Sequence, residues 1–350
     1  MGRRVLITGL STFWGGRLAQ ALEADPAIDV IVGLDTRDPR VPLERTEFIR
    51  SDPSYSILSR IVRSTRVDTV LHTFLVVDAS VPEARSMDEI NVIGTSNLCA
   101  AAGAPGSTVR TVVVKSSTIV YGASRQDPAF FSESTPRSHP PRTRLERSLA
   151  EVEHYVDDFA LDHPETAVSV LRYCNVVGPD MTGSLAGLLA RPFVPSIQGF
   201  DPLLQVVHED DVVRSLRFAM DRGLRGTFNV AGDGSLPWSE VVAIAGRRRW
   251  PLPAVATEEV ARGLRLAGVV KISSELLGLL RYGRGVDNSA LKQAGFEYLY
   301  DTAAAVAEHV SAIRLRRTLG PGSSSGRGGQ DLEEFLRRSP AVVRQPTTSG

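Results

Sequence analysis

The chain has 350 residues and a mass of 37.8 kDa, which is long for one small domain and ordinary for a two-lobed enzyme. Hydrophobic residues make up 42 % and charged residues 23 %, so a mostly disordered or collagen-like protein is excluded. Forty Lys and Arg residues balance forty Asp and Glu residues. The balance gives no reason to expect nucleic acid or an anionic membrane as the main partner.

The two cysteines, Cys99 and Cys174, lie inside apolar segments and have no metal-ligand spacing. We therefore expect reduced, buried thiols and no metal site. The first residues, MGRRVLITGL, lack the apolar stretch and cleavage site of a signal peptide. No run reaches the roughly 18 apolar residues that span a bilayer. These features predict a cytoplasmic protein without a membrane span.

In chain order, short β-branched runs alternate with amphipathic segments. Near-continuous apolar strands separated by helices are typical of a parallel sheet that is covered on both faces. The pattern predicts an α/β, Rossmann-type doubly wound fold. The expected strands are 3–9, 30–35, 46–50, 67–73, 110–117, 167–173 and 226–232, and the expected helices are 14–24, 55–64, 83–102, 145–162 and 208–220.

The regular alternation of strands and helices ends after Pro179, which indicates a second lobe. We expect residues 1–178 to form a dinucleotide-binding domain, to which 206–232 returns. Residues 179–205 and 233–318 then form a smaller, mainly helical substrate lobe, in which Arg247–Arg249 are a solvated basic run or, alternatively, a phosphate contact. The Gly/Ser-rich composition that begins at 320 predicts a flexible tail over 319–350, dispensable for folding.

The turn from Thr8 to Gly16 follows the first strand and opens the first helix. Such a turn directs free N–H groups and the helix dipole at a pyrophosphate. Asp35 lies twenty residues after Gly15, where a carboxylate can bind the two ribose hydroxyls. Thr12 stands where the fingerprint has its second glycine, so its side chain either donates to the phosphate or crowds it.

The chain resembles the extended short-chain dehydrogenase/reductases, in particular the NAD-dependent epimerase/dehydratase family. The resemblance covers about residues 3–315. It rests on VLITG…GG at 5–16, Asp35, Asp52, VDTVLH at 67–72, NVIGTSNL at 91–98, SSTIVYG at 116–122, LRYCNVVGP at 171–179, VVHEDDVV at 206–213 and GTFNVAG at 226–232.

This resemblance implies NAD as the cofactor. Asp35 would hold the adenosine ribose and repel the 2′-phosphate of NADP, although Arg37 nearby is an argument for NADP. Asp52 would contact the adenine. The other residues implied in cofactor binding are Gly9, Thr12, Phe13, Trp14, Gly15, Thr36, Thr73 and Tyr173, the last beside the nicotinamide with Cys174 and Asn175.

The resemblance also implies a Ser/Thr and a Tyr-x-x-x-Lys pair, in which the lysine lowers the pKa of the tyrosine. Ser117 matches the Ser/Thr and Asn91 the helix asparagine, but the chain contains no Tyr-x-x-x-Lys. The two positions hold Leu145 and Leu149, or Thr143 and Arg147 in a neighbouring register. Tyr121, Tyr155 and His139 are candidates to replace the missing catalytic pair. The alternative is that the two tyrosines have structural roles and that His139 lies in a solvated loop.

The leading functional hypothesis is a reaction of epimerase or dehydratase type on a sugar nucleotide or similar polar substrate. The family commonly has an arginine where this chain has Leu204, so we expect Arg281 or Arg284 to bind a diphosphate, with Asn175 as a polar partner. One alternative is a dinucleotide-binding sensor or scaffold protein with little catalysis. Another is a reductase for an isoprenoid or polyketide intermediate. A homodimer is also expected.

Overall fold

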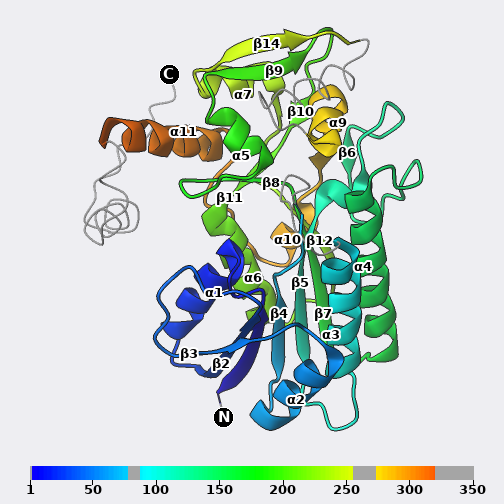
Figure 1. Ribbon diagram of the computed structural model, residues 1–350. Helices are drawn as coiled ribbons and strands as arrows, with labels where there is room; N and C mark the ends of the chain where they lie inside the picture. Colours follow the sequence, from blue (N-terminus) through cyan, green and yellow to red (C-terminus); the bar gives the residue numbers. More distant parts are fainter. Residues whose placement is uncertain (1, 78–86, 255–272, 320–350) are drawn as a thin grey trace.

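A parallel sheet forms the centre of the larger lobe (Figure 1). The computed structural model describes residues 2–77, 87–254 and 273–319. Within these residues, seven strands pair in the order β12-β7-β5-β4-β1-β2-β3, and every pairing is parallel. Their bounds are β1 Arg3–Thr8, β2 Ile28–Asp35, β3 Thr46–Arg50, β4 Thr69–His72, β5 Thr111–Ser117, β7 Ala167–Tyr173 and β12 Gly226–Val230. The doubly wound fold predicted from the sequence is confirmed.

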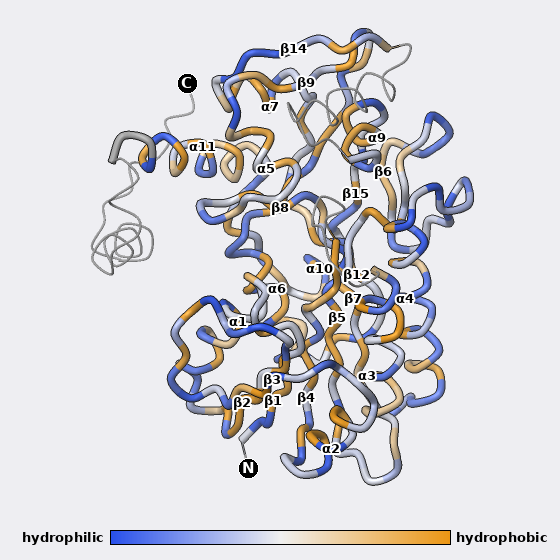
Figure 2. The backbone as a smooth tube through the Cα atoms, in the orientation of Figure 1, coloured by the Kyte–Doolittle hydropathy of each residue, from blue (hydrophilic) through white to orange (hydrophobic). Residues whose placement is uncertain are grey.

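Helices cover both faces of this sheet, as Figure 1 shows. One face packs on α1 (Phe13–Glu23) and α6 (Glu209–Arg222). The other packs on α2 (Tyr55–Thr65), α3 (Gly94–Ala102) and α4 (Arg144–Asp162). Because both faces are covered, the strands are apolar along their length, which Figure 2 shows as orange segments in the middle of the lobe.

The chain reverses its direction across the sheet between β1 and β4. Strands β2 and β3 extend from one side of β1, whereas β4, β5, β7 and β12 extend from the other. In open α/β sheets, ligands bind in the crevice outside the carboxyl ends of the strands at such a reversal. The topology therefore places a binding site beyond Thr8 and His72, which are paired at these ends.

The long helix expected over 83–102 differs in its first half. Residues 78–86 lie outside the described part. From Glu89 to Ile93 the chain forms a π-helical turn, η1, and α3 follows from Gly94. Such π-helical turns occur often at functional sites. Here η1 carries Asn91, which the sequence selects as a site residue.

The smaller lobe has its own apolar core. Its helices are α5 (Ser184–Leu189), α7 (Trp238–Ile244), α9 (Ser274–Tyr282) and α11 (Thr302–Leu319), whereas α10 (Ser289–Gln293) packs on the core of the larger lobe through Leu291. Short strand pairs accompany them: β8 (Asn175–Val177) with β11 (Val206–His208), β9 (Phe193–Ile197) with β14 (Arg248–Leu252), β10 (Leu203–Leu204) with β13 (Leu236–Pro237), and β6 (Phe130–Phe131) with β15 (Gly285–Val286). None of the described helices is long and apolar enough to cross a membrane.

Two sequence predictions for this lobe concern its basic run and the tail that follows it. The basic run at Arg247–Arg249 does not belong to a helical region, because Arg248 begins β14 and pairs with Phe193. The side chains of Arg248 and Arg249 are exposed, as expected for a solvated run, whereas Arg247 is half-buried and donates from Nε to the carbonyl of Leu189 at 2.7 Å. The tail over 319–350 lies outside the described residues from 320 onward, and Leu319 itself ends α11.

Candidate cofactor pocket and active site

The turn between β1 and α1 is tightly packed and requires its glycines. Gly9 has a φ of +83°, which L side chains rarely adopt, and a Cβ there would lie 2.5 Å from the backbone of Phe74. A Cβ on Gly15 would lie 2.2 Å from the carbonyl oxygen of Gly9. The first turn of α1 can approach the end of β1 this closely only without side chains at these positions.

Thr12 is the N-cap of α1, and its hydroxyl is already used within the turn. Its Oγ1 donates to the carbonyl of Gly9 at 2.6 Å and accepts from the N–H of Gly15 at 3.0 Å. One N–H of the helix N-terminus is therefore satisfied by the protein itself. Of the two expectations for Thr12, direct donation to a phosphate is the one that this geometry disfavours.

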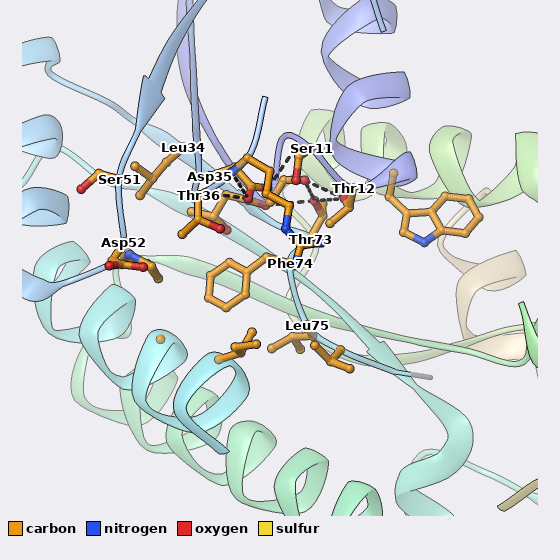
Figure 3. Close-up of a pocket in the computed structure, with 18 of the residues that line it drawn as sticks. Ser11, Thr12, Leu34, Asp35, Thr36, Ser51, Asp52, Thr73, Phe74 and Leu75 are labelled. Carbon is orange, nitrogen blue, oxygen red and sulfur yellow. Dashed lines mark hydrogen bonds between the residues drawn. The ribbon is translucent and has the colours of Figure 1, made fainter. Parts of the chain in front are cut away.

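Asp35 lies at the carboxyl end of β2 and faces the same turn. Its carboxylate accepts from the N–H of Ser11 at 2.9 Å and from that of Thr36 at 2.7 Å (Figure 3). It also accepts from the N–H of Arg37 at 3.3 Å, and these bonds fix the carboxylate at the cavity wall. The acid that the sequence selects is thus oriented by backbone N–H groups that directly follow β1 and β2.

A cavity of about 620 Å³ opens beside these residues. Five segments line it: the turn after β1, the end of β2, the loop between β3 and α2, the loop after β4, and η1 with the start of α3. The predicted residues that line it are Gly9, Thr12, Phe13, Trp14, Asp35, Thr36, Asp52 and Thr73. Arg37 and Arg40 line it as well, and so do Phe74 and Leu75, which no sequence motif identifies as site residues.

Tyr173 does not line this cavity. Its ring is buried, and its hydroxyl lies 2.9 Å from the hydroxyl of Ser215 on α6. Burial raises the pKa of Tyr173 well above its usual value. Its phenol is therefore a buried group of the sheet–helix interface and not a proton donor to a ligand.

Asn91 and Ser117 have backbone partners in the structure. The amide of Asn91 pairs with the N–H and carbonyl of Val76 at 2.8 and 3.0 Å, so it positions the loop after β4 that lines the cavity. Ser117 Oγ accepts from the N–H of Ile119 at 3.2 Å and caps the short helix η2 (Thr118–Tyr121). Its hydroxyl also donates to the carbonyl of Tyr173, at a longer 3.4 Å.

The start of α4 has no proton-transfer pair. Leu145 and Leu149 are buried in the main apolar core. In the neighbouring register, Thr143 caps α4 by accepting from the N–H of Glu146 at 3.1 Å, and Arg147 is exposed. Each leucine contributes roughly 1.5–3 kcal/mol of apolar burial, so these positions now serve packing.

The three candidates to replace the catalytic tyrosine have other environments in the structure. Tyr121 donates to Asn229 Oδ1 at 2.8 Å and accepts from Arg172 at 2.7 Å, while Tyr155 is exposed on α4. The expectation of a solvated His139 is wrong. Its side chain is only 7 % exposed, because the imidazole packs against Gly122 and lies 3.8 Å from Asp127.

The arginines expected to bind substrate differ in environment. Arg281 stacks on the rings of Phe200 and Tyr282, at 5.0 and 5.5 Å from their centres. Arg284 is buried, donates from Nε to the carbonyl of Gly122 at 2.6 Å, and its pKa is lowered by burial to about 10. An isolated bridge joins Arg284 to Leu204.

Other polar clusters give no sign of a metal centre. No group of three or more His, Cys, Asp or Glu side chains suited to a metal ion occurs among the described residues. His208 caps α6 by accepting from the N–H of Asp210 at 3.2 Å.

The comparison with family models decides the classification. The model of the NAD-dependent epimerase/dehydratase family matches residues 5–231. The chain belongs to this family. An uncharacterized protein of Mycobacterium tuberculosis (strain H37Rv) is 32 % identical over 325 residues, which is 91 % of this chain and 86 % of that protein. A second uncharacterized protein, from Mycobacterium bovis, matches equally.

Solved structures of other epimerase/dehydratase proteins share the fold. The dTDP-glucose 4,6-dehydratase DesIV of Streptomyces venezuelae, a double mutant with NAD bound, has a TM-score of 0.68 at 22 % identity over 90 % of this chain and 98 % of its own. The UDP-glucose 4-epimerase of Thermus thermophilus, in complex with NAD, has a TM-score of 0.67 at 22 % identity over 89 % of this chain and 99 % of its own. At this identity the likeness establishes the fold.

Proposed function

We propose that this family member binds NAD(H) in the 620 Å³ cavity and acts as an oxidoreductase of epimerase or dehydratase type. The observation that carries the proposal is the position of Asp35. Its carboxylate faces the cavity directly beside the N-terminus of α1, so one ligand can place ribose hydroxyls on Asp35 and a pyrophosphate on the helix. Asp52, at the far side of the same cavity, is suited to the adenine.

The same carboxylate favours NAD over NADP. A 2′-phosphate on the ribose would meet the negative charge of Asp35, whereas the 2′-hydroxyl donates to it. Arg37 lines the cavity and is the counter-argument. Titration of the protein with NADH and NADPH, followed by cofactor fluorescence, tests the choice. We expect tighter NADH binding, and Asp35→Asn to weaken NADH binding by about tenfold or more. Tighter binding of NADPH would contradict it.

For the substrate, we propose a sugar nucleotide or a similar diphosphate. Support comes from Arg284, which lies beside Leu204, the position where the family commonly has its arginine. Arg284, which directly precedes β15, brings a positive charge to the place that Leu204 leaves neutral. Burial raises the pKa of the Cys174 thiol, next to Asn175, and the positive charge of Arg284 opposes part of this rise.

Binding of UDP and TDP to Arg284→Ala, Arg281→Ala and the parent tests the substrate class. We expect about tenfold to hundredfold weaker binding for Arg284→Ala, the usual effect of losing a charge-assisted bond. Arg281→Ala is the matched control, because Arg281 is held by aromatic rings. A parent protein that binds neither nucleotide at millimolar concentration argues against a sugar nucleotide.

A second function has its own supporting observation. The core positions of Leu145 and Leu149, together with the engaged hydroxyls of Ser117 and Tyr121, favour a dinucleotide-binding sensor or scaffold with little catalysis. A panel of sugar nucleotides, monitored at the reduced-nicotinamide absorbance band, separates the two functions. NADH binding without any absorbance change across the panel supports the sensor.

A further inference from the structure

Lys115 is a buried lysine on an interior strand of the sheet. It belongs to β5, its side chain is only 2 % exposed, and its Nζ lies 5.2 Å from the ring centre of Trp14 and 5.4 Å from that of Tyr173. Among the described residues, no carboxylate forms an ion pair with it and no hydrogen bond from its Nζ is found. Desolvation lowers the pKa of Lys115 to about 8. Lysines are almost never fully buried unless they are paired.

The position of Lys115 relates it to the cofactor pocket. Trp14, whose ring it faces, lines the cavity. Lys115 and Ser117 stand two residues apart on β5, and therefore point to the same face of the sheet. Ser117 in turn is paired with Tyr173 on β7.

The fold assigns the two halves of a dinucleotide to opposite sides of the reversal between β1 and β4. Asp35 on β2 marks the adenosine side, and the N-terminus of α1 marks the pyrophosphate. The second half of the ligand then extends toward β4, β5 and β7. Lys115 lies on this second side and faces the ring of Trp14, which lines the cavity.

We propose that Lys115 lies beside the nicotinamide ring of a bound dinucleotide as a cation, and that the charge of this ring determines whether its Nζ keeps its proton. This inference rests on the proposed binding of NAD(H). The oxidised ring carries a positive charge and the reduced ring does not. A protonated Lys115 opposes the oxidised ring, so binding of NAD⁺ releases the proton from Nζ to solvent, whereas NADH binds with the amine protonated.

We expect Lys115 to be the group that titrates, because the other titratable groups near it keep their charge. Burial raises the pKa values of Tyr173 on the neighbouring β7, of the Cys174 thiol directly after β7, and of Tyr298 in the segment before α11, so these groups stay neutral below pH 9.5. On α1, Arg17 forms ion pairs with Asp180 and Asp210. On α6, Asp211 pairs with Arg214. Thr73 follows β4 and does not titrate.

Calorimetric titration of the parent with NAD⁺ and NADH at pH 6.5, 8 and 9.5 tests the linkage. We expect NAD⁺ affinity to rise about tenfold over this range, equivalent to a shift of one pKa unit, while NADH affinity changes little. Lys115→Met should bind NAD⁺ tightly at every pH, and Lys115→Arg weakly at every pH. Lys292→Met, which removes an exposed lysine paired with Asp233, is the matched control and should keep the parent's pH dependence.

A second measurement needs no variant at Lys115. The chain has three lysines, Lys115, Lys271 and Lys292, so ¹³C labelling at the lysine ε-carbon gives three NMR signals. We expect one of them to titrate near pH 8 in the free protein and at a lower pH with NAD⁺ than with NADH. If both dinucleotides bind while their affinity ratio and this signal are independent of pH and ligand, the linkage is wrong. If neither dinucleotide binds, the proposed function falls and the linkage with it.

Discussion

Thr12 illustrates how one side chain alters a binding turn. In the dinucleotide fingerprint the second glycine lets the backbone approach the pyrophosphate, and here a threonine hydroxyl caps Gly15 instead. The cap stabilises α1, but it uses an N–H that a phosphate would otherwise accept from. The local stability of the helix and the affinity for the ligand therefore compete at this residue.

We expect Thr12→Gly to bind NADH about tenfold more tightly, because it releases the N–H of Gly15 and removes the methyl group from the cavity wall. Glycine is also an acceptable N-cap, so the free energy of unfolding should fall by only about 0.5 kcal/mol. Thr12→Ser keeps the cap and serves as the control, with affinity near that of the parent. Calorimetry and urea unfolding measure both effects; weaker binding by Thr12→Gly would show that the cap organises the site.

At the scale of elements, the π-helical turn η1 connects the sheet to the cavity. Its Asn91 holds both backbone groups of Val76 and so sets the path of the loop after β4. This loop supplies Thr73, Phe74 and Leu75 to the cavity wall. An asparagine that the resemblance associates with catalysis thus has a positioning role in the described structure.

We expect Asn91→Leu to lower the free energy of unfolding by about 1–3 kcal/mol, since it leaves the N–H and carbonyl of Val76 without their partner. NADH affinity should fall as well, because the loop loses its fixed position. Asn97, which also lines the cavity but bonds to Pro53 on the far wall, provides a comparison through Asn97→Ala. Unchanged NADH affinity in Asn91→Leu would mean that the loop is held by other contacts.

At the scale of the whole molecule, the sheet contains a neutral histidine in its centre. His72 is fully buried between the hydroxyls of Thr8 and Thr95, at 2.8 and 3.0 Å. Burial lowers its pKa from 6.5 to about 3. His72 therefore becomes protonated below pH 6.5 in the unfolded chain, but in the folded protein only below about pH 3.

This difference makes the free energy of unfolding fall as the pH decreases from 6.5 toward 3. The loss from His72 alone is on the order of 5 kcal/mol at the low end, from 1.36 kcal/mol per pKa unit. We expect His72→Gln to be less stable than the parent at pH 7 but to lose less stability on acidification. Urea unfolding at pH 7, 6, 5 and 4 measures the slopes. Parallel slopes for the two proteins would show that other groups control acid unfolding.

The sequence by itself determined the sheet, its covering helices and one end of the site. Apolar strands, the glycines of the first turn and Asp35 are local signals, because each depends on residues within about twenty positions. The absence of Tyr-x-x-x-Lys could also be read directly, since the chain has so few lysines.

Only the tertiary structure decided how the other residues are used. Contacts between distant segments placed Lys115 against Trp14 and Tyr173, joined Arg284 to Leu204, and turned the hydroxyl of Tyr173 toward α6. Sequence motifs identify a side chain and its strand, but burial and pairing with segments a hundred residues away set its charge and its partner. For that reason Lys115 looked like an ordinary strand residue in the sequence, and its desolvated amine became evident only once the sheet and α1 were assembled.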